Sequence, residues 1–496
     1  MIRFFILAKI APSFAELPSK IAPSFVDLNT ILSYYTDKRG RDMLRDRTAF
    51  LINWLHSPTR KPLVIRGARQ VGKTWLIRNL AAVQKKQLIE LNFEKRSDLE
   101  SLFSSNDPTE ILIQLSAFIG NKIDPSKAIL FLDEIQAAPS LLEKLRWFAE
   151  DMPELPVIAA GSLLEFTLTK HAFSMPVGRI NYMHLEPLSF KEFLNAVGLH
   201  ELRTYLESYE WHSTIPTATH TKLMKLLKEY LVIGGMPAAV LSWITEKSPE
   251  AVSQIHFDLL ATYRDDFAKY SGRLSIERLE DILSSVPRQL GKKFVYKHAN
   301  SEMNVQPLKQ ALDLLSKARV CYTTKATAAN GLPMGAEVHT KFSKVIMLDC
   351  GLCCASLGLS LQQFKEVSEI SLVNNGGMAE QLVGQLLRTT LAPYAPPSLY
   401  YWQRDKKGSE AEIDYLIQHE NQIVPVEVKA GTSGTLRSLH QFMKEKKKPV
   451  AIRINSDTPR AGYVEVKDST QQALSYPLLS LPFYLVEEVH RLISSY

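Results

Sequence analysis

Eight consecutive residues, Gly67–Thr74 (GARQVGKT), have the types and spacing that phosphate binding requires. They match G-x-x-x-x-G-K-[ST], follow a strand-like stretch (63–66, LVIR) and precede a helix-like run (75–83). Glycine lets backbone N–H groups close around phosphate oxygens, and the helix N-terminus adds positive potential. Lys73 would neutralise the β- and γ-phosphates, and Thr74 would ligate Mg²⁺. The sequence therefore predicts an ATP and Mg²⁺ site at Gly67, Ala68, Arg69, Gln70, Val71, Gly72, Lys73 and Thr74.

Two adjacent acids further along the chain supply the expected partner of this loop. The apolar stretch 128–132 (AILFL) is typical of a buried parallel strand, and it ends at Asp133 and Glu134. Asp133 would hold the Mg²⁺ shell, and Glu134 would polarise the attacking water. A third apolar stretch, 156–160 (PVIAA), leads to Ser162. Ser162 would either sense the γ-phosphate or cap a helix, and both interpretations stay open.

The stretch from residue 61 to about 194 resembles the prokaryotic AAA-type P-loop ATPases that carry a C-terminal domain of unknown function. The resemblance rests on RGARQVGKTWLI, FLDEIQ, AAGSLLEF and MPVGRI, and it continues through YLVIGGMPAAV (230–240), YRDDFAKY (263–270), MLDCGL (347–352) and EIDYLI…VEVKAG. It implies ATP hydrolysis with Mg²⁺. It also makes Arg179 a candidate arginine finger, acting on a neighbouring subunit of a homo-oligomer. The alternative is an arginine that braces a loop.

A second group of residues with catalytic chemistry lies near the C-terminal end. Asp414 lies in an alternating stretch, 412–417, and Glu427 lies in a strand-like stretch, 423–428, beyond a turn. If the two stretches pair as a hairpin, Asp414 approaches Glu427, and both carboxylates can bind one divalent ion. Lys429 would then lie beside a metal-activated water.

The spacing D-x₁₂-E-x-K resembles the PD-(D/E)xK nuclease fold. This resemblance implies a restriction-endonuclease-like domain with Glu380, Asp414 and Glu427 as metal ligands and Lys429 as the nuclease lysine. Ile413 stands where the motif has proline. Because folds of this kind host many functions, nuclease activity and partner recognition by an inactive domain both stay open.

The middle of the chain shows helical patterns. Residues 200–275 read as mostly helical, with a helix-stopping turn at 234–237 (GGMP). We interpret this turn as a hinge after the ATPase region or as a purely structural turn. Residues 276–345 combine helices with a strand pair, which resembles a winged helix. Its lysines would contact DNA phosphates or form ordinary surface: Lys309, Lys317 and Lys325.

Two further clusters favour ordinary structural roles. CGLCC (350–354) supplies too few ligands for a closed zinc site, which predicts buried free thiols at Cys350, Cys353 and Cys354. The run 444–448 (KEKKK) predicts solvated surface.

Composition excludes several classes of protein. The chain has 496 residues, 45% of them hydrophobic and 22% charged, which excludes wholly disordered, collagen-like and disulfide-rich proteins. Four cysteines indicate a reducing compartment. No apolar run reaches the ~18–20 residues that cross a bilayer, so we expect a cytoplasmic protein without a membrane partner. The net charge of +7 permits a polyanionic partner such as DNA.

The predicted fold class is α/β: a P-loop NTPase parallel sheet flanked by helices, a helical and winged-helix region, and a C-terminal α/β nuclease-like domain. KIAPSF occurs at both 9–14 and 20–25, before a more conventional sequence opens at Met43. Residues 1–42 are therefore predicted to be a poorly ordered extension or a variable arm. The expected parts are 1–42 (extension), 43–199 (AAA-type ATPase), 200–275 (helical), 276–345 (winged-helix-like), 346–470 (restriction-endonuclease-like) and 471–496 (C-terminal segment).

Overall fold

The structure is a computed structural model. It describes residues 43–162, 164, 176–270, 275–359, 376–404, 411–431, 435–467 and 473–496. The predicted extension 1–42 lies outside the described residues. Within the described part of the chain, no helix is both long and apolar enough to cross a membrane.

The N-terminal half is built on a five-stranded sheet whose paired strands all run parallel, in the order β2-β3-β4-β1-β5. The strands are β1 (Leu63–Arg66), β2 (Gln87–Asn92), β3 (Ala128–Asp133), β4 (Val157–Gly161) and β5 (Asn181–His184). Every residue of β3 is buried, as its continuous apolar sequence predicts.

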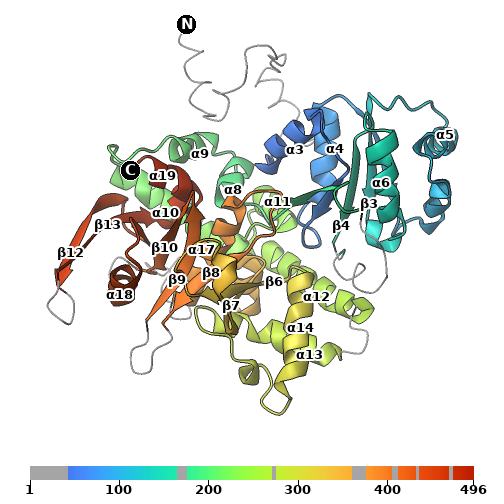
Figure 1. Cartoon of the computed structure of the whole chain (residues 1–496). Coiled ribbons are helices and arrows are strands. Elements are labelled where there is room, and N and C mark those ends of the chain that lie inside the picture. Colours follow the sequence, from blue (N-terminus) through green and yellow to red (C-terminus); the bar gives the residue numbers. More distant parts are fainter. Residues whose placement is uncertain are drawn as a thin grey trace, which may run out of the picture.

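Helices cover both faces of this sheet (Figure 1). One face packs against α3 (Arg47–His56) and α4 (Lys73–Val83), because alternate strand residues such as Ile65 and Phe131 join their apolar side chains in one core cluster. The other face packs against α5 (Pro108–Ile119) and α6 (Leu141–Asp151) through Val64 and Leu130. This confirms the predicted parallel sheet flanked by helices, the arrangement of a P-loop NTPase fold.

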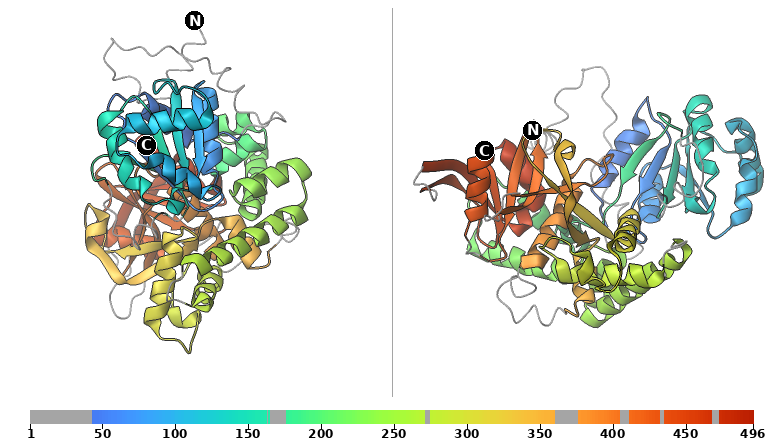
Figure 2. Two further views of the ribbon diagram at one scale, coloured as in Figure 1. Left: turned by 90° about the vertical axis from the view of Figure 1, so that its right-hand side faces the viewer. Right: turned by 60° about the horizontal axis from the view of Figure 1, so that its bottom comes forward.

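The second half begins with helices and ends in a mixed sheet. The right-hand view of Figure 2 shows the green helices running along one side of the molecule, from one sheet to the other. The remaining helices are α8 (Phe190–Ala196), α9 (His200–Glu207), α10 (Thr217–Ile233), α11 (Pro237–Glu246), α12 (Pro249–Tyr270), α13 (Ile276–Ser285), α14 (Val305–Lys317), α15 (Cys350–Ser356), α17 (Gly377–Thr390), α18 (Arg437–Lys446) and α19 (Val489–Ser494). Short 3₁₀ segments are η2 (Ser97–Phe103), η3 (Ile135–Ala137), η4 (Pro287–Gln289), η5 (Tyr296–His298), η6 (Met334–Glu337) and η9 (Phe483–Glu488).

Eight strands form the second sheet, in the order β12-β13-β11-β10-β9-β8-β6-β7. They are β6 (Cys321–Thr327), β7 (Val338–Met347), β8 (Leu399–Gln403), β9 (Glu412–His419), β10 (Gln422–Val428), β11 (Ala451–Asn455), β12 (Arg460–Lys467) and β13 (Ala473–Pro482). The predicted hairpin is confirmed, since β9 and β10 pair antiparallel. The strand pair expected as a wing also forms, as β6 and β7.

The position of that strand pair differs from a separate winged-helix domain. β6 pairs in parallel with β8, so β6 and β7 complete one edge of the C-terminal sheet. The physical reason is that β6 has two hydrogen-bonding edges, and β8 covers the one that β7 leaves. The proposed boundary between residues 345 and 346 falls inside β7, and the division into domains stays a prediction.

The GGMP segment is a tight turn between α10 and α11. Gly234 has a left-handed φ of 74° and ends α10. The backbone N–H of Gly235 donates to Asp349 Oδ2 (2.7 Å), and the Gly235 carbonyl accepts from the Leu188 N–H (2.7 Å). A Cβ at either glycine would overlap these partners. The GGMP turn therefore contacts the MLDCGL segment (347–352). Cys350 in this segment and Cys353 and Cys354 just after it are free, buried thiols, as predicted.

Candidate active site

The carboxyl ends of the parallel strands bring the predicted ATPase residues to one edge of the sheet. β1 leads directly into the loop Gly67–Thr74, and its neighbour β4 leads to Ser162 in the register Arg66↔Gly161. On the other side of β4, β3 ends at Asp133, opposite Asn92 of β2. Ligands of open α/β sheets bind outside this edge, so the topology alone places the phosphate loop beside the acids.

Two residues of the phosphate loop have a left-handed backbone conformation. Gly72 has a φ of 95° and Gln70 a φ of 63°. A Cβ on Gly67 would lie 2.6 Å from the carbonyl oxygen of Leu185, so the backbone is packed too closely for a side chain there. Lys73 begins α4, and its ammonium group donates to the carbonyl oxygens of Gly67 (3.1 Å) and Ala68 (2.9 Å).

Burial lowers the pKa of Lys73 to about 8, while the charges of Glu134 and Asp133 act in the opposite direction. The ammonium group therefore lies in a dry position where a negatively charged ligand gains most from its charge. A phosphate group in the loop would replace the two carbonyl oxygens as the partner of Lys73.

Asp133 is arranged as a ligand for a hard cation. Its Oδ2 accepts hydrogen bonds from Thr74 Oγ1 (3.0 Å) and from Asn92 Nδ2 (3.3 Å). Its Oδ1 is buried and has no hydrogen-bond partner within the described part of the chain. Burial and the neighbouring charge of Glu134 raise the pKa of Asp133. A carboxylate oxygen without a donor beside a threonine hydroxyl fits Mg²⁺, which prefers oxygen ligands.

Glu134 and Ser162 flank this position. Glu134 has a left-handed φ of 52°, and its Oε2 accepts from Gln136 Nε2 (2.5 Å). Ser162 is buried, and its hydroxyl has no partner among the described residues. Both interpretations of Ser162, contact with the γ-phosphate and capping of a helix, stay predictions.

Arg179 lies at the other end of the sheet. It precedes β5, so it is at the amino end of the parallel strands, whereas the phosphate loop is at the carboxyl end. Its side chain is 48% exposed and donates to Glu150 Oε1 (2.6 Å). It does not reach the phosphate loop of its own chain, so an arginine-finger role would have to be exerted on another subunit.

Two of the three predicted C-terminal acids, Glu380 and Asp414, converge on a lysine that the sequence did not single out. Lys344 Nζ on β7 lies 2.9 Å from Glu380, 2.5 Å from Glu412 and 3.4 Å from Asp414. Its side chain is 3% exposed. Burial opposes its charge, but the carboxylates raise its pKa well above the usual value. Glu380 and Asp414 lie 36 and 70 positions from Lys344 in the chain, so no local spacing in the sequence marks this lysine.

Glu427 lies beside this group with Lys429. Glu427 Oε1 accepts from Lys429 Nζ (2.6 Å), and its buried Oε2 has no partner in the described residues. Asp414 Oδ2 accepts from the backbone N–H of Val428 (2.8 Å), so it reaches the neighbouring strand. Burial and the repulsion of Asp414 raise the pKa of Glu427 to about 7, and the same two effects raise that of Glu380 to about 8.

These carboxylates thus form ion pairs with two ammonium groups, those of Lys344 and Lys429. Within the described ranges, no three His, Cys, Asp or Glu side chains are grouped to hold a metal ion. Two lysines of the expected winged-helix-like region have neighbours within it: Lys317 pairs with Asp313 (2.9 Å), and Lys309 lies 6.0 Å from the centre of the Tyr296 ring.

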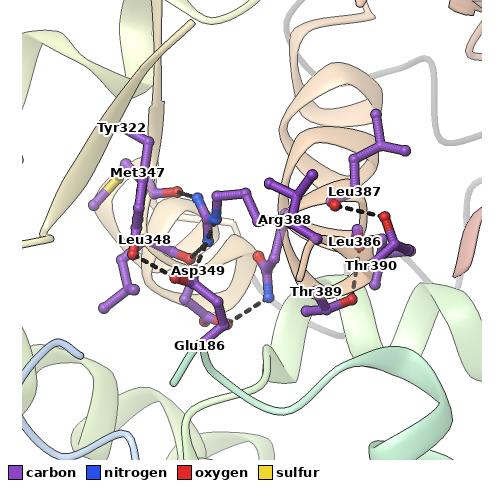
Figure 3. A network of polar contacts seen from close by, with 12 residues as sticks. Glu186, Tyr322, Met347, Leu348, Asp349, Leu386, Leu387, Arg388, Thr389 and Thr390 are labelled. Carbon is purple, nitrogen blue, oxygen red and sulfur yellow. Dashed lines mark hydrogen bonds and ion pairs between the residues drawn. The ribbon is translucent and has the colours of Figure 1, made fainter. Parts of the chain in front are cut away.

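A buried polar network joins the two halves of the molecule (Figure 3). Arg388 on α17 is fully buried and donates to Glu186 Oε2 (3.0 Å) and to the carbonyl oxygens of Met347 (3.2 Å) and Leu348 (2.5 Å). Its guanidinium lies 3.8 Å from the centre of the Tyr322 ring, and Tyr322 donates to Glu186 Oε1 (2.9 Å).

This network reaches the phosphate loop through Arg45. Arg45 donates to the carbonyl oxygens of Glu186 (2.6 Å) and Val71 (2.9 Å), and also to Glu192 Oε1 (3.1 Å). Sequence reasoning missed Arg45, Glu186 and Arg388. Their partners are far apart in the chain, so no local pattern could have found them.

Comparison with known families agrees with the first site. A family model described as an AAA domain matches residues 59–194, the stretch that contains the five-stranded sheet and the phosphate loop. The chain therefore carries an AAA-type P-loop ATPase domain. Two further models match: a domain of unknown function (DUF8612) over residues 224–363, and another (DUF4143) over residues 375–483. A search of curated proteins finds no match.

Solved structures with some likeness include Orc1 of Aeropyrum pernix in complex with DNA, at 12% identity and a TM-score of 0.26, covering 66% of this chain and 95% of that one. The RuvB Holliday junction branch migration motor of Thermotoga maritima has 15% identity and a TM-score of 0.26, covering 60% of this chain and 90% of that one.

Proposed function

We propose that the protein is a Mg²⁺-dependent ATPase that hydrolyses ATP at the loop Gly67–Thr74. The observation that carries the proposal is the contact of Thr74 Oγ1 with Asp133 Oδ2 (3.0 Å), which brings the two proposed Mg²⁺ ligands together beside the phosphate loop. Mg²⁺ bound there would neutralise charge on the β- and γ-phosphates. Lys73 binds the phosphates, and Glu134 accepts a proton from the attacking water.

Two variants separate binding from hydrolysis. Lys73→Ala should abolish ATP binding, because the triphosphate loses its buried cationic partner. Glu134→Gln should bind ATP and fail to hydrolyse it. The matched controls are Lys127→Ala, at a lysine whose side chain is 81% exposed, and Glu110→Gln, at an exposed glutamate. Normal turnover in Lys73→Ala would refute the assignment, and normal turnover in Glu134→Gln would remove Glu134 from the mechanism.

Arg179 extends this proposal to a homo-oligomer. Its position at the amino end of the sheet favours action on a neighbouring subunit. Mixing Lys73→Ala protein with Arg179→Ala protein tests this, since a mixed assembly contains some sites with both residues intact. Recovery of ATPase activity on mixing supports the finger. Unchanged activity of Arg179→Ala alone refutes it.

For the C-terminal domains we propose recognition of a DNA or protein partner under control of the ATP cycle. The observation that favours recognition over cutting is Lys344, whose ammonium group lies among Glu380, Glu412 and Asp414 where a nuclease would need a metal ion. The competing proposal is a nuclease with Glu380, Asp414 and Glu427 as ligands and Lys429 beside the reacting water. Cleavage of plasmid DNA by the wild type with Mg²⁺ or Mn²⁺, lost in Asp414→Asn, would establish the nuclease and refute the recognition-only proposal.

A further inference from the structure

Helix α12 holds the phosphate loop at one residue, Arg69, by two separate contacts. Arg69 Nη1 donates to both carboxylate oxygens of Asp266, at 2.5 Å and 2.6 Å. The hydroxyl of Tyr263 donates to the backbone carbonyl oxygen of Arg69 (2.9 Å). Asp266 is 6% exposed and Tyr263 is 3% exposed. The two residues are three apart on a helix and so lie on one face. The helix therefore fixes both the side chain and the backbone of Arg69.

The contacts fall where the loop most needs support. Gln70, the next residue, has a left-handed φ of 63°, which non-glycine residues adopt only when their surroundings hold them there. On the other side, Arg45 Nη1 donates to the carbonyl oxygen of Val71 (2.9 Å). The carbonyl groups on both sides of Gln70 are thus held from outside the loop. This restraint keeps the loop N–H groups directed toward a bound phosphate.

The charge of Asp266 also matters for the site. Arg69 is a second cation near Lys73, and after burial its like charge is among the influences that lower the pKa of Lys73. Asp266 and Glu94 both pair with the Arg69 guanidinium, so they fix its orientation. Removal of the Asp266 charge would leave Arg69 to reorient within the site.

We propose that α12 is a brace for the nucleotide site, in which Asp266 and Tyr263 are positioning residues that hold the phosphate loop in its binding shape. The inference rests on the proposed ATPase function. Coupling free energies are reciprocal. ATP binding therefore strengthens the docking of α12, and loss of that docking weakens ATP binding. The nucleotide state is thereby transmitted to α12, a helix of the second half of the chain.

Binding of a fluorescent ATP analogue, with competition by ATP, tests the brace. Asp266→Asn should weaken ATP binding about tenfold, and Tyr263→Phe, which removes only the hydroxyl, about threefold. Asp265→Asn is the matched control, because it removes the same charge from the exposed neighbouring position. The control should bind ATP as the wild type does, and Asp266→Glu should recover part of the affinity.

Hydrogen exchange provides a readout that a merely structural role would not produce. ATP should slow exchange of the α12 amides in the wild type and in Asp265→Asn, but not in Asp266→Asn, whatever the melting temperatures of the nucleotide-free proteins. The brace is refuted if all three proteins bind ATP equally well, or if Asp266→Asn melts earlier without nucleotide and keeps the ATP-dependent protection. A wild type that binds no ATP would instead overturn the proposed ATPase, and the brace with it.

Discussion

Replacement of Arg388 by methionine is the sharpest test of how the two halves are joined. Methionine keeps most of the length and apolar volume of the side chain, but it removes the charge and every donor. The Glu186 side chain is 4% exposed, and among the described residues its carboxylate would then keep only the Tyr322 hydroxyl as a donor. The carbonyl oxygen of Leu348 would lose the Arg388 donor as well.

The expected cost follows from this burial. Breaking a fully buried ion pair by removing one partner costs about 3–5 kcal/mol of unfolding free energy, because a charge is left buried and uncompensated. Glu186→Gln should cost about 1.5–3 kcal/mol, since the amide oxygen can still accept from Arg388. The double variant leaves a neutral amide instead of a charge. Its loss should therefore be smaller than the sum of the single losses by about 1–3 kcal/mol.

Urea unfolding followed by far-ultraviolet circular dichroism measures these differences at a common slope. The control is Arg78→Met, the same substitution in an ion pair with Glu90 (2.6 Å) whose arginine is 61% exposed. It should cost no more than about 1 kcal/mol. If Arg388→Met cost as little as this control, or if the two single losses simply added, the buried pair would not join the halves as we describe.

Three further outcomes follow from other positions. Lys344→Met leaves three carboxylates without their ammonium group and should lower the free energy of unfolding by about 3–5 kcal/mol; millimolar Mn²⁺ should partly restore it. The control is Lys317→Met, at a lysine whose side chain is 37% exposed and pairs with Asp313, and equal melting temperatures of the two variants would contradict the reasoning. Burial, with the nearby charge of Arg319, lowers the pKa of His184 to about 3 in the folded protein. Between this pH and about pH 6.5, His184 is therefore neutral in the folded protein but protonated in the unfolded chain. The free energy of unfolding is therefore highest above about pH 6.5, and it falls by about 2 kcal/mol between pH 7 and pH 5. Urea titrations of His184→Gln should show a smaller fall over the same pH range. Gly235→Ala places a Cβ against a backbone carbonyl and should cost more than about 2 kcal/mol in the same assay, whereas Gly462→Ala, with open space around it, should stay within about 0.5 kcal/mol.

Local patterns predicted the elements whose signals lie within a few neighbouring residues. The phosphate loop is continuous in sequence, and its flanking strand and helix follow from adjacent apolar residues. The hairpin of β9 and β10 follows from alternation on both sides of a turn, where Glu420 adopts the left-handed φ of 50°. The end of helix α10 follows from the conformational freedom of Gly234, its C-cap residue.

What could not be predicted depends on contacts between distant segments. Lys344 lies 36 positions from Glu380 and 70 from Asp414, and only the assembly of β7, α17 and β9 brings them together. The wing-like strand pair looked independent because its own hairpin is local, whereas β8, which pairs with β6, follows much later in the chain. Asp266 belongs to a segment quoted for its resemblance, but its contact with Arg69 spans 197 positions.

The long reach of the Glu186–Arg388 contact has a consequence for the order of synthesis. The two residues are 202 positions apart. At about 5–20 residues per second, the ribosome needs roughly 10–40 s to reach Arg388 after it has added Glu186. All five strands of the first sheet have been synthesised before that interval begins, and they can emerge and assemble on the nascent chain during it. During that interval the Glu186 carboxylate lacks Arg388, its ion-pair partner in the folded protein.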